Sequence, residues 1–274
     1  MRIGELARRS GVAVATLRAW ERRYGVLGPD RTSGGHRVYG PEDLAQVRLL
    51  ASRVESGVSI SRAARELEQA SPETNHAAEA ALIQARLWGA VEKFDLAAFS
   101  SLVGDGLARW GTARTLDSVV VPTLRRIGEE WREDPEWVAR EHFASTALRS
   151  LLVNRLPQLP AGPTALAFSP EGERHDLGVV MAAVTLAGAG WYPVVLGADT
   201  PWTSVEAVLA RLEPDATLVG AQQRGPAARF LSRASLPRHT RLVLGGAGFR
   251  AEDAGRIGAR FHGGPFAELP GALE

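Results

Sequence analysis

The sequence predicts a multidomain protein that is α-helical in its first 157 residues and α/β in the rest. Residues 1–72 are rich in arginine and helical in pattern, with one glycine-rich interruption. Residues 77–157 repeat apolar side chains at helical spacing, whereas residues 162–274 alternate short apolar runs with helical stretches. Polar residues 69–75 and proline-rich residues 157–163 are the predicted linkers. We therefore expect three domains with the boundaries 1–72, 77–157 and 162–274.

Composition excludes several classes of protein. No apolar run approaches the roughly 18 residues that span a bilayer, and the N-terminus lacks the apolar core of a signal peptide. The absence of cysteine excludes disulfides, cysteine-ligated zinc and iron–sulfur clusters. Among side chains, histidines and carboxylates remain as metal ligands. We expect a cytoplasmic protein with no membrane partner.

Positive charge is concentrated at the N-terminal end. Residues 1–72 hold 12 Arg against 8 Asp plus Glu, a balance of +4, and the remainder of the chain has a balance of −3. The local excess matters more than the total of +1, because attraction to phosphate depends on where the cations lie. The N-terminal domain is therefore the candidate for binding nucleic acid.

The same region has the spacing of a helix-turn-helix. Residues 3–12 are predicted to form a helix and a tight turn, and residues 14–24 a second helix of the kind that enters the major groove. A solvated basic helix is the commoner fate of an arginine cluster, but this cluster coincides with the turn and with a basic glycine turn that would form a wing. The predicted DNA-binding residues are Thr16, Arg18, Trp20, Arg22, Arg23 and Tyr24 on the helix and Arg31, His36, Arg37 and Tyr39 on the wing.

Two blocks in this domain resemble the signatures of the MerR family. They are Leu17-Arg18-x-Trp20-Glu21-Arg22-Arg23-Tyr24 and Gly34-Gly35-His36-Arg37-x-Tyr39, and the resemblance extends over residues 2–70. It implies a winged helix-turn-helix that reads operator DNA as a dimer. The segment after Ser71 lacks the sustained heptads of the long dimerisation helix found in many members, so this route to a dimer is not expected.

The C-terminal third predicts a parallel sheet with helices on both faces. Ligands of such sheets bind at the carboxyl ends of the strands, where the residues 173–178, 197–201, 220–223 and 245–248 fall. The predicted strands are 164–168, 192–196, 216–219, 241–244 and 260–262, and the predicted helices are 177–189, 203–212, 226–235 and 251–259.

His175 is the strongest candidate for a metal ligand. Glu173 precedes it by two residues and could hold one ring nitrogen, which fixes the tautomer and raises the basicity of the other nitrogen. Gly178 follows three residues later and permits close approach of a bulky ligand at the start of a helix. A lone histidine near the end of a strand is more often a satisfied polar residue, so the flanking pattern carries the hypothesis.

These residues resemble the motif of the cobalamin-binding domain, Asp-x-His-x-x-Gly followed later by Ser-x-Leu and Gly-Gly. Glu173 stands for the Asp and His175 for the histidine, and Ala221-Gln222-Gln223 replaces the Ser-x-Leu. The resemblance implies a Rossmann-like domain in which His175 is the lower axial ligand of cobalt. The predicted cofactor contacts here are Glu173, His175, Asp176, Leu177, Gly178, Ala221, Gly245 and Gly246.

The middle domain adds a second group of candidates. Asp134-Pro135 is typical of a helix start, so Trp131 would end one helix, while Val138, Glu141 and His142 would lie on one face of the next. An indole, an apolar side chain and two polar groups could enclose a nucleoside. The alternatives are that tryptophans at helical spacing belong to the bundle core and that Glu141 and His142 are a solvated pair.

Trp-x9-Glu-His between a MerR-like and a cobalamin-like domain resembles the CarH/LitR photoreceptor repressors along essentially the whole chain. The resemblance implies a four-helix bundle that caps adenosylcobalamin, with Trp131, Val138, Glu141 and His142 around the adenosyl group. It also implies a homo-oligomer, dimer or tetramer, which blocks a promoter in the dark. Light would break the cobalt–carbon bond, dissociate the tetramer and release operator DNA.

Arg132 departs from that family, in which a histidine at this position becomes the upper cobalt ligand after illumination. A guanidinium has no lone pair to offer cobalt, so His142 is a conceivable substitute, or the switch works otherwise. One alternative is a haem or bilin pigment, with Arg132 paired to a propionate, and another is a light-independent cobalamin-sensing repressor. An enzyme is not expected, because the chain offers no further domain for a substrate.

Overall fold

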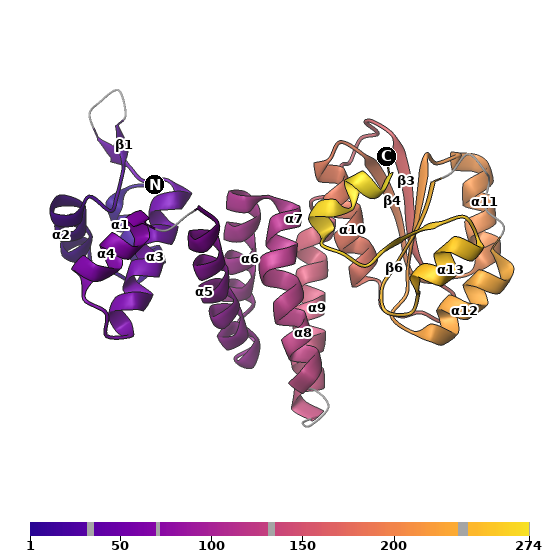
Figure 1. Cartoon of the computed structure of the whole chain (residues 1–274), viewed down its shortest axis with the longest axis horizontal. Helices are drawn as coiled ribbons and strands as arrows, with labels where there is room; N and C mark the ends of the chain where they lie inside the picture. The colour runs from indigo at the N-terminus through magenta and orange to yellow at the C-terminus, as the bar shows by residue number, and fades with distance from the viewer. Residues whose placement is uncertain (32–35, 70–71, 131–134, 235–240, 274) are drawn as a thin grey trace.

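Three units follow one another along the long axis of the molecule in the computed structural model (Figure 1). The structure describes residues 1–31, 36–69, 72–130, 135–234 and 241–273. The N-terminal unit lies at one end, the helical bundle in the middle and the sheet at the other end (Figure 1). The predicted fold class, helical units followed by a parallel α/β unit, is confirmed.

The N-terminal unit is a helix-turn-helix with a short wing. Gly11, at φ 75°, ends the first helix in a left-handed conformation that suits glycine and turns the chain into the second. The two wing strands are antiparallel, and Leu6, Leu17 and Leu50 lie at the centre of the small core. The elements are α1 (Ile3–Ser10), α2 (Val14–Tyr24), β1 (Asp30–Arg31), β2 (Arg37–Val38), α3 (Pro41–Glu55) and α4 (Ile60–Gln69).

The middle unit contains the four predicted helices within the described residues, the third of them a composite that includes a π-helical turn. Gly111, at φ 78°, ends α6, whereas Gly104 lies inside α6, because a helix interior tolerates a single glycine. The elements are α5 (Pro72–Glu92), α6 (Leu96–Trp110), α7 (Thr112–Thr115), η1 (Leu116–Val120), α8 (Val121–Glu130) and α9 (Pro135–Val153).

The prediction of a polar linker through residue 75 was wrong. Helix α5 begins at Pro72, so residues 72–75 are helical rather than extended. Proline is tolerated in the first turn of a helix, where its missing N–H has no partner in any case. The sequence signal of a polar, proline-containing stretch therefore marked a helix start.

The C-terminal unit is a parallel sheet of five strands among the described residues, in the order β4-β3-β5-β6-β7. Every predicted strand exists, and β4 extends four residues beyond its predicted end. The strands are β3 (Thr164–Pro170), β4 (Tyr192–Thr200), β5 (Ala216–Gly220), β6 (Arg241–Gly245) and β7 (Arg260–His262), and the helices are α10 (Leu177–Gly188), α11 (Trp202–Leu212), α12 (Arg224–Arg233) and α13 (Ala251–Arg256).

Helix α10 joins the sheet to the bundle. Val179 and Ala183 pack on the sheet, whereas Val180, Met181 and Val184 belong to the core of the bundle. A helix that is apolar on both sides must be buried on both, and α10 accordingly lies between the two units (Figure 1).

The C-terminal tail makes a second connection between the two units. It forms η2 (Phe266–Glu268) and η3 (Pro270–Leu273), and the Asp117 carboxylate on η1 accepts hydrogen bonds from the backbone N–H groups of Phe266 and Ala267 at 2.7 and 3.0 Å.

In the described part of the chain, no helix combines the length and apolar character needed to cross a membrane.

Candidate functional site

His175 lies where the strand order of the sheet reverses. Strand β3 is flanked by β4 on one side and β5 on the other, and the loops that leave adjacent strands at such a point diverge and open a crevice for a ligand. His175 follows β3, and Gln222 follows β5. The topology therefore brings together two loops that are 47 residues apart in the sequence.

The Glu173 carboxylate organises both loops. One oxygen accepts hydrogen bonds from the His175 backbone N–H at 3.0 Å and from the His175 ring Nδ1 at 2.5 Å. The other oxygen accepts the backbone N–H groups of Gln222 and Gln223, both at 2.8 Å. Glu173 is fully buried, so these donors replace the water that its charge loses.

The same contacts set the ionisation of the site. Burial alone would raise the pKa of the Glu173 carboxyl, but the hydrogen bonds from His175, Gln223 and Gln222 outweigh burial and hold the pKa below its ordinary value. An ionised carboxylate only accepts hydrogen bonds, so Nδ1 of His175 is the donor. Nε2 then carries the lone pair of the neutral ring, and the His175 side chain is 56% exposed.

The glycines around this loop differ in their roles. A Cβ on Gly220 would lie 2.5 Å from Cγ2 of Val179, and a Cβ on Gly246, at φ 90°, would lie 2.3 Å from the Ala221 carbonyl oxygen. These two glycines permit close packing of the strand ends on α10 and on each other. Among the described residues, a Cβ on Gly178 would meet the Gln222 side chain alone, at 3.9 Å, so the start of α10 has room for a ligand.

An ion pair connects the histidine loop to the bundle. Asp176 follows His175 directly, and its carboxylate accepts hydrogen bonds from the Arg149 guanidinium of α9, the shortest at 2.8 Å. Arg149 was missed by sequence reasoning, because no local pattern distinguishes it from other arginines on helices. Only the packing of α9 beside α10 gives it a role.

The bundle candidates lie on the first turns of the same helix. Val138, His142 and Arg149 fall within about 40° of one another around α9, at 100° per residue. The side chains of His142 and Glu141 are 75% and 39% exposed, and Val138 is 37% exposed. The stripe from Arg149 to Val138 is therefore directed to the side of the molecule where the histidine loop lies. Trp131 and Arg132, predicted cofactor contacts, lie outside the described residues.

Trp137 holds the first turn of α9 in place. It is buried in the bundle core, as the alternative interpretation expected, and stacks on Trp88 of α5 with ring centroids 4.4 Å apart. The Arg126 guanidinium lies over the Trp88 ring, 3.7 Å from its centroid. Cation–π and aromatic stacking of this kind stabilise a fixed geometry, and here they fix the turn that carries Val138.

The predicted DNA-binding residues divide into a surface group and a core group. Arg18, Arg22 and Arg23 are exposed on α2, with Thr16 half-buried beside them, and His36 and Arg37 are exposed on the wing. Arg31 lies at the end of β1, and Tyr24 is half-buried against the core.

Two residues predicted to contact DNA lie in the core of the unit. Trp20 is 8% exposed and Tyr39 only 1% exposed, and large aromatic side chains contribute much of the apolar surface that a small core buries. Their positions in the MerR-like motifs are explained by packing. Tyr39 donates its hydroxyl to the Glu21 carboxylate at 2.8 Å, and Arg37 donates to the same carboxylate at 2.7 Å. Glu21 thereby attaches the wing to α2.

This contact makes the ionisation of Tyr39 testable. Burial, together with the hydrogen bond to Glu21 and its negative charge, raises the pKa of Tyr39 to about 12 from 10.0. Because the folded-state pKa is the higher one, the contribution to stability is complete below about pH 10 and is lost as the pH rises toward 12, by at most about 2–3 kcal/mol. Alkaline titration of tyrosinate absorbance, compared with Tyr39→Phe, should show a difference that titrates near pH 12. A difference centred at the ordinary value would contradict the buried hydrogen bond.

Comparison with known proteins agrees with this architecture. Residues 1–70 match the MerR HTH family of regulatory proteins, and residues 83–153, which form most of the bundle, match a B12-binding domain. Over 70% of its length, the chain resembles in fold the Methanosarcina barkeri monomethylamine corrinoid protein, with a TM-score of 0.54 at 20% identity over 97% of that protein.

Two relatives align along nearly the whole chain. The HTH-type transcriptional repressor CarA of Myxococcus xanthus is 33% identical over 91% of this chain and 88% of its own length. The repressor CarH of the same organism is 33% identical over 92% of this chain and 91% of its own length. The chain therefore belongs to the family of MerR-type transcriptional repressors with a B12-binding domain that includes CarA and CarH.

Proposed function

We propose that this protein is a repressor that binds adenosylcobalamin between the bundle and the sheet. When light reaches the cofactor, the protein would change its oligomeric state and its affinity for operator DNA. The observation that carries the proposal is the Glu173–His175 pair. A buried carboxylate holds Nδ1, so that Nε2 is directed away from the protein core with its lone pair available. A single oriented imidazole suits a metal whose remaining ligands come from its own macrocycle.

The residues present fit such a cofactor. His175 would hold cobalt from below, and the open start of α10 at Gly178 would admit the ring. The exposed stripe on α9 from Arg149 to Val138 is about 16 Å long, at 1.5 Å per residue, and would lie against the upper side, with Val138, Glu141 and His142 toward the adenosyl group. Trp131 and Arg132, which lie outside the described residues, stay proposed cofactor contacts on the sequence alone. When bound, the cofactor would supply a light-sensitive cobalt–carbon bond.

The chain's own residues would convert that event into a change of assembly. Ligand contacts that exist in only one state of a protein stabilise that state. Contacts from α9 to the adenosyl group would disappear with its release, and the bundle would then be held to the sheet by α10, the C-terminal tail and the Arg149–Asp176 pair. We propose a dimer or tetramer in the dark and a smaller species after illumination.

Arg132 favours a specific alternative, a cobalamin sensor that does not respond to light. A guanidinium has no lone pair to offer cobalt, and the histidine that α9 offers instead is His142, whose side chain is 75% exposed. The B12-domain match favours cobalamin over the haem and bilin alternatives.

Size-exclusion chromatography of the full chain tests the proposal. Protein loaded with adenosylcobalamin in the dark should elute as a dimer or tetramer and shift to a smaller species after green light, whereas methylcobalamin-loaded and cofactor-free protein serve as controls. An absorption spectrum of the loaded protein identifies the pigment. Cobalamin binding with no change in elution would support the light-independent sensor, and a haem or bilin spectrum would overturn the cofactor assignment.

A further inference from the structure

The contact between the DNA-binding unit and the bundle is not a shared hydrophobic core. In the described part of the chain, the DNA-binding unit (residues 1–69) and the bundle each have their own cluster of buried apolar side chains. No such cluster spans the two units. Helix α3 packs beside α5 and α6 of the bundle, whereas α2 lies farther from it (Figure 1). Two units joined without a common core are expected to move relative to each other unless specific contacts hold them.

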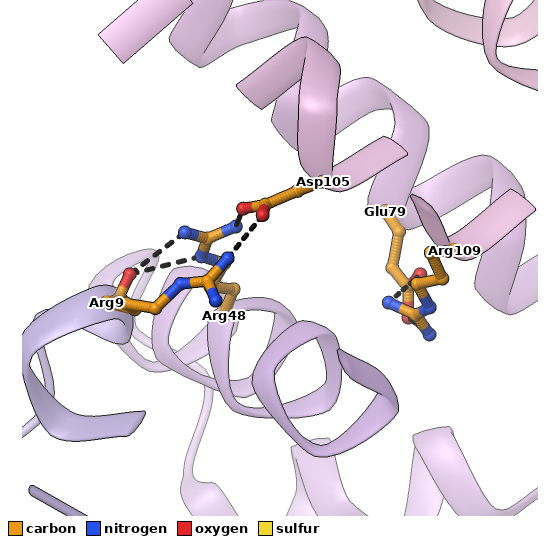
Figure 2. A network of polar contacts seen from close by, with 5 residues as sticks. All are labelled: Arg9, Arg48, Glu79, Asp105 and Arg109. Carbon is orange, nitrogen blue, oxygen red and sulfur yellow. Dashed lines mark hydrogen bonds and ion pairs between the residues drawn. The ribbon is translucent and has the colours of Figure 1, made fainter. Parts of the chain in front are cut away.

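Asp105 provides such contacts. It lies on α6 of the bundle, and its two carboxylate oxygens accept hydrogen bonds from Arg9 of α1 and from Arg48 of α3, the latter at 3.1 Å (Figure 2). Arg48 also donates to the Arg9 carbonyl oxygen at 3.0 and 3.3 Å, at the end of α1. The side chains of Arg48 and Asp105 are only 12% and 22% exposed. The Asp105 carboxylate therefore connects both α1 and α3 of the DNA-binding unit to the bundle.

Asp105 supplies the negative charge that compensates the two arginines of this contact. The side chain of Arg9 is 34% exposed and that of Arg48 only 12% exposed. Without the charge of Asp105, both guanidinium groups would lose the carboxylate that compensates them in a partly buried site, which is unfavourable.

The packing beside the ion pairs is incomplete. A cavity of about 140 Å³ lies between the units, and its apolar wall includes Leu44, Leu82, Ile83 and Trp110. Side chains of the two units do not pack against each other across this space. Glu79 and Arg109 also line it, and they form an ion pair at 2.8 Å between α5 and α6, which stiffens the bundle side alone (Figure 2).

We infer that Asp105 closes an electrostatic latch, made with Arg9 and Arg48, that fixes the direction in which α2 and the wing point relative to the bundle. The latch touches neither DNA nor the histidine site. A displacement of α6 relative to α3 opens it and frees the DNA-binding unit to reorient. Through the latch, a change in the bundle would alter the position of the DNA-reading surface. This regulatory role rests on the proposed function, whereas the existence of the latch does not.

Distances between two spin labels test the latch directly. The chain has no cysteine, so two introduced cysteines are the only labelling sites. Ser61→Cys on α4 and Arg125→Cys on α8, both at exposed positions, carry one spin label each in the full-length, cofactor-free protein. Pulsed double electron–electron resonance should yield one narrow distance distribution. Asp105→Asn should broaden it severalfold, because the neutral amide removes the charge that both arginines contact.

Matched variants separate the latch from general effects. Glu129→Gln, the same change at an exposed site on α8, should leave the distribution narrow, and Arg9→Gln should broaden it from the opposite side of the contact. Binding of a random-sequence duplex should stay within about threefold in Asp105→Asn, since α2 and the wing are unchanged. If Asp105→Asn no longer binds the duplex, that variant has unfolded. The distance distribution of Arg9→Gln then tests the latch in its place. A distribution that stays narrow in the folded Asp105→Asn protein overturns the latch, with or without cobalamin binding.

Discussion

Replacing His175 with alanine is expected to reduce cobalamin retention at least about a hundredfold without unfolding the protein. Loss of the groups that orient a metal ligand costs about 10–100-fold in affinity, so loss of the ligand itself should cost no less. The His175 side chain is 56% exposed, and its removal leaves no cavity in the core. The measurement is the ratio of cobalamin to protein after chromatography in the dark, with circular dichroism as the check on folding.

Two further variants define the origin of this effect. Glu173→Gln should weaken retention about 10–100-fold, because a neutral amide cannot accept from His175, Gln222 and Gln223 in the same way. His36→Ala, on the exposed wing, is the matched histidine control and should retain full cofactor. Unchanged cofactor content in His175→Ala would remove His175 as the ligand.

Replacing Arg22 and Arg37 together with alanine is expected to weaken DNA binding at least about tenfold. Both side chains are exposed, and Arg37 is attached to α2 through its hydrogen bond to Glu21. Each lost phosphate contact should lower the slope of log affinity against log salt by about 0.9. Titration of duplex DNA at several salt concentrations measures both quantities.

The matched control is Arg62→Ala. It removes the same charge from the same unit, but on α4, where Arg62 pairs with Glu66. Its salt slope should remain that of the unmodified protein. An unaltered slope in the Arg22 and Arg37 variant would place both residues outside the DNA interface.

The secondary structure followed closely from the sequence, because its signals are local. Helix α2 has its predicted bounds, and the predicted and observed strands agree to within a few residues. The errors have the same local origin. A polar segment with a proline is compatible with either a linker or a helix start, and the choice between them at Pro72 depends on the packing of α5 in the bundle.

The aromatic residues of the MerR-like motifs show where a pattern misleads. A motif identifies positions that matter, and it does not say whether they matter for contact or for packing. Trp20 and Tyr39 were predicted to contact DNA and are buried, while Glu21, absent from the predicted interface, attaches the wing to α2. The burial of a side chain depends on elements that are distant in sequence.

The sequence by itself determined the order of the three units, the helix-turn-helix, the strands of the sheet and the Glu173–His175 pair, because each depends on residues a few positions apart. The tertiary structure alone decided which groups complete them. The amides of Gln222 and Gln223 reach Glu173 only when β5 lies beside β3, and Arg149 meets Asp176 only when α9 packs on α10. Asp105 meets Arg9 and Arg48 in the same way. Contacts across so many residues are fixed by the packing of whole elements, which no local pattern encodes.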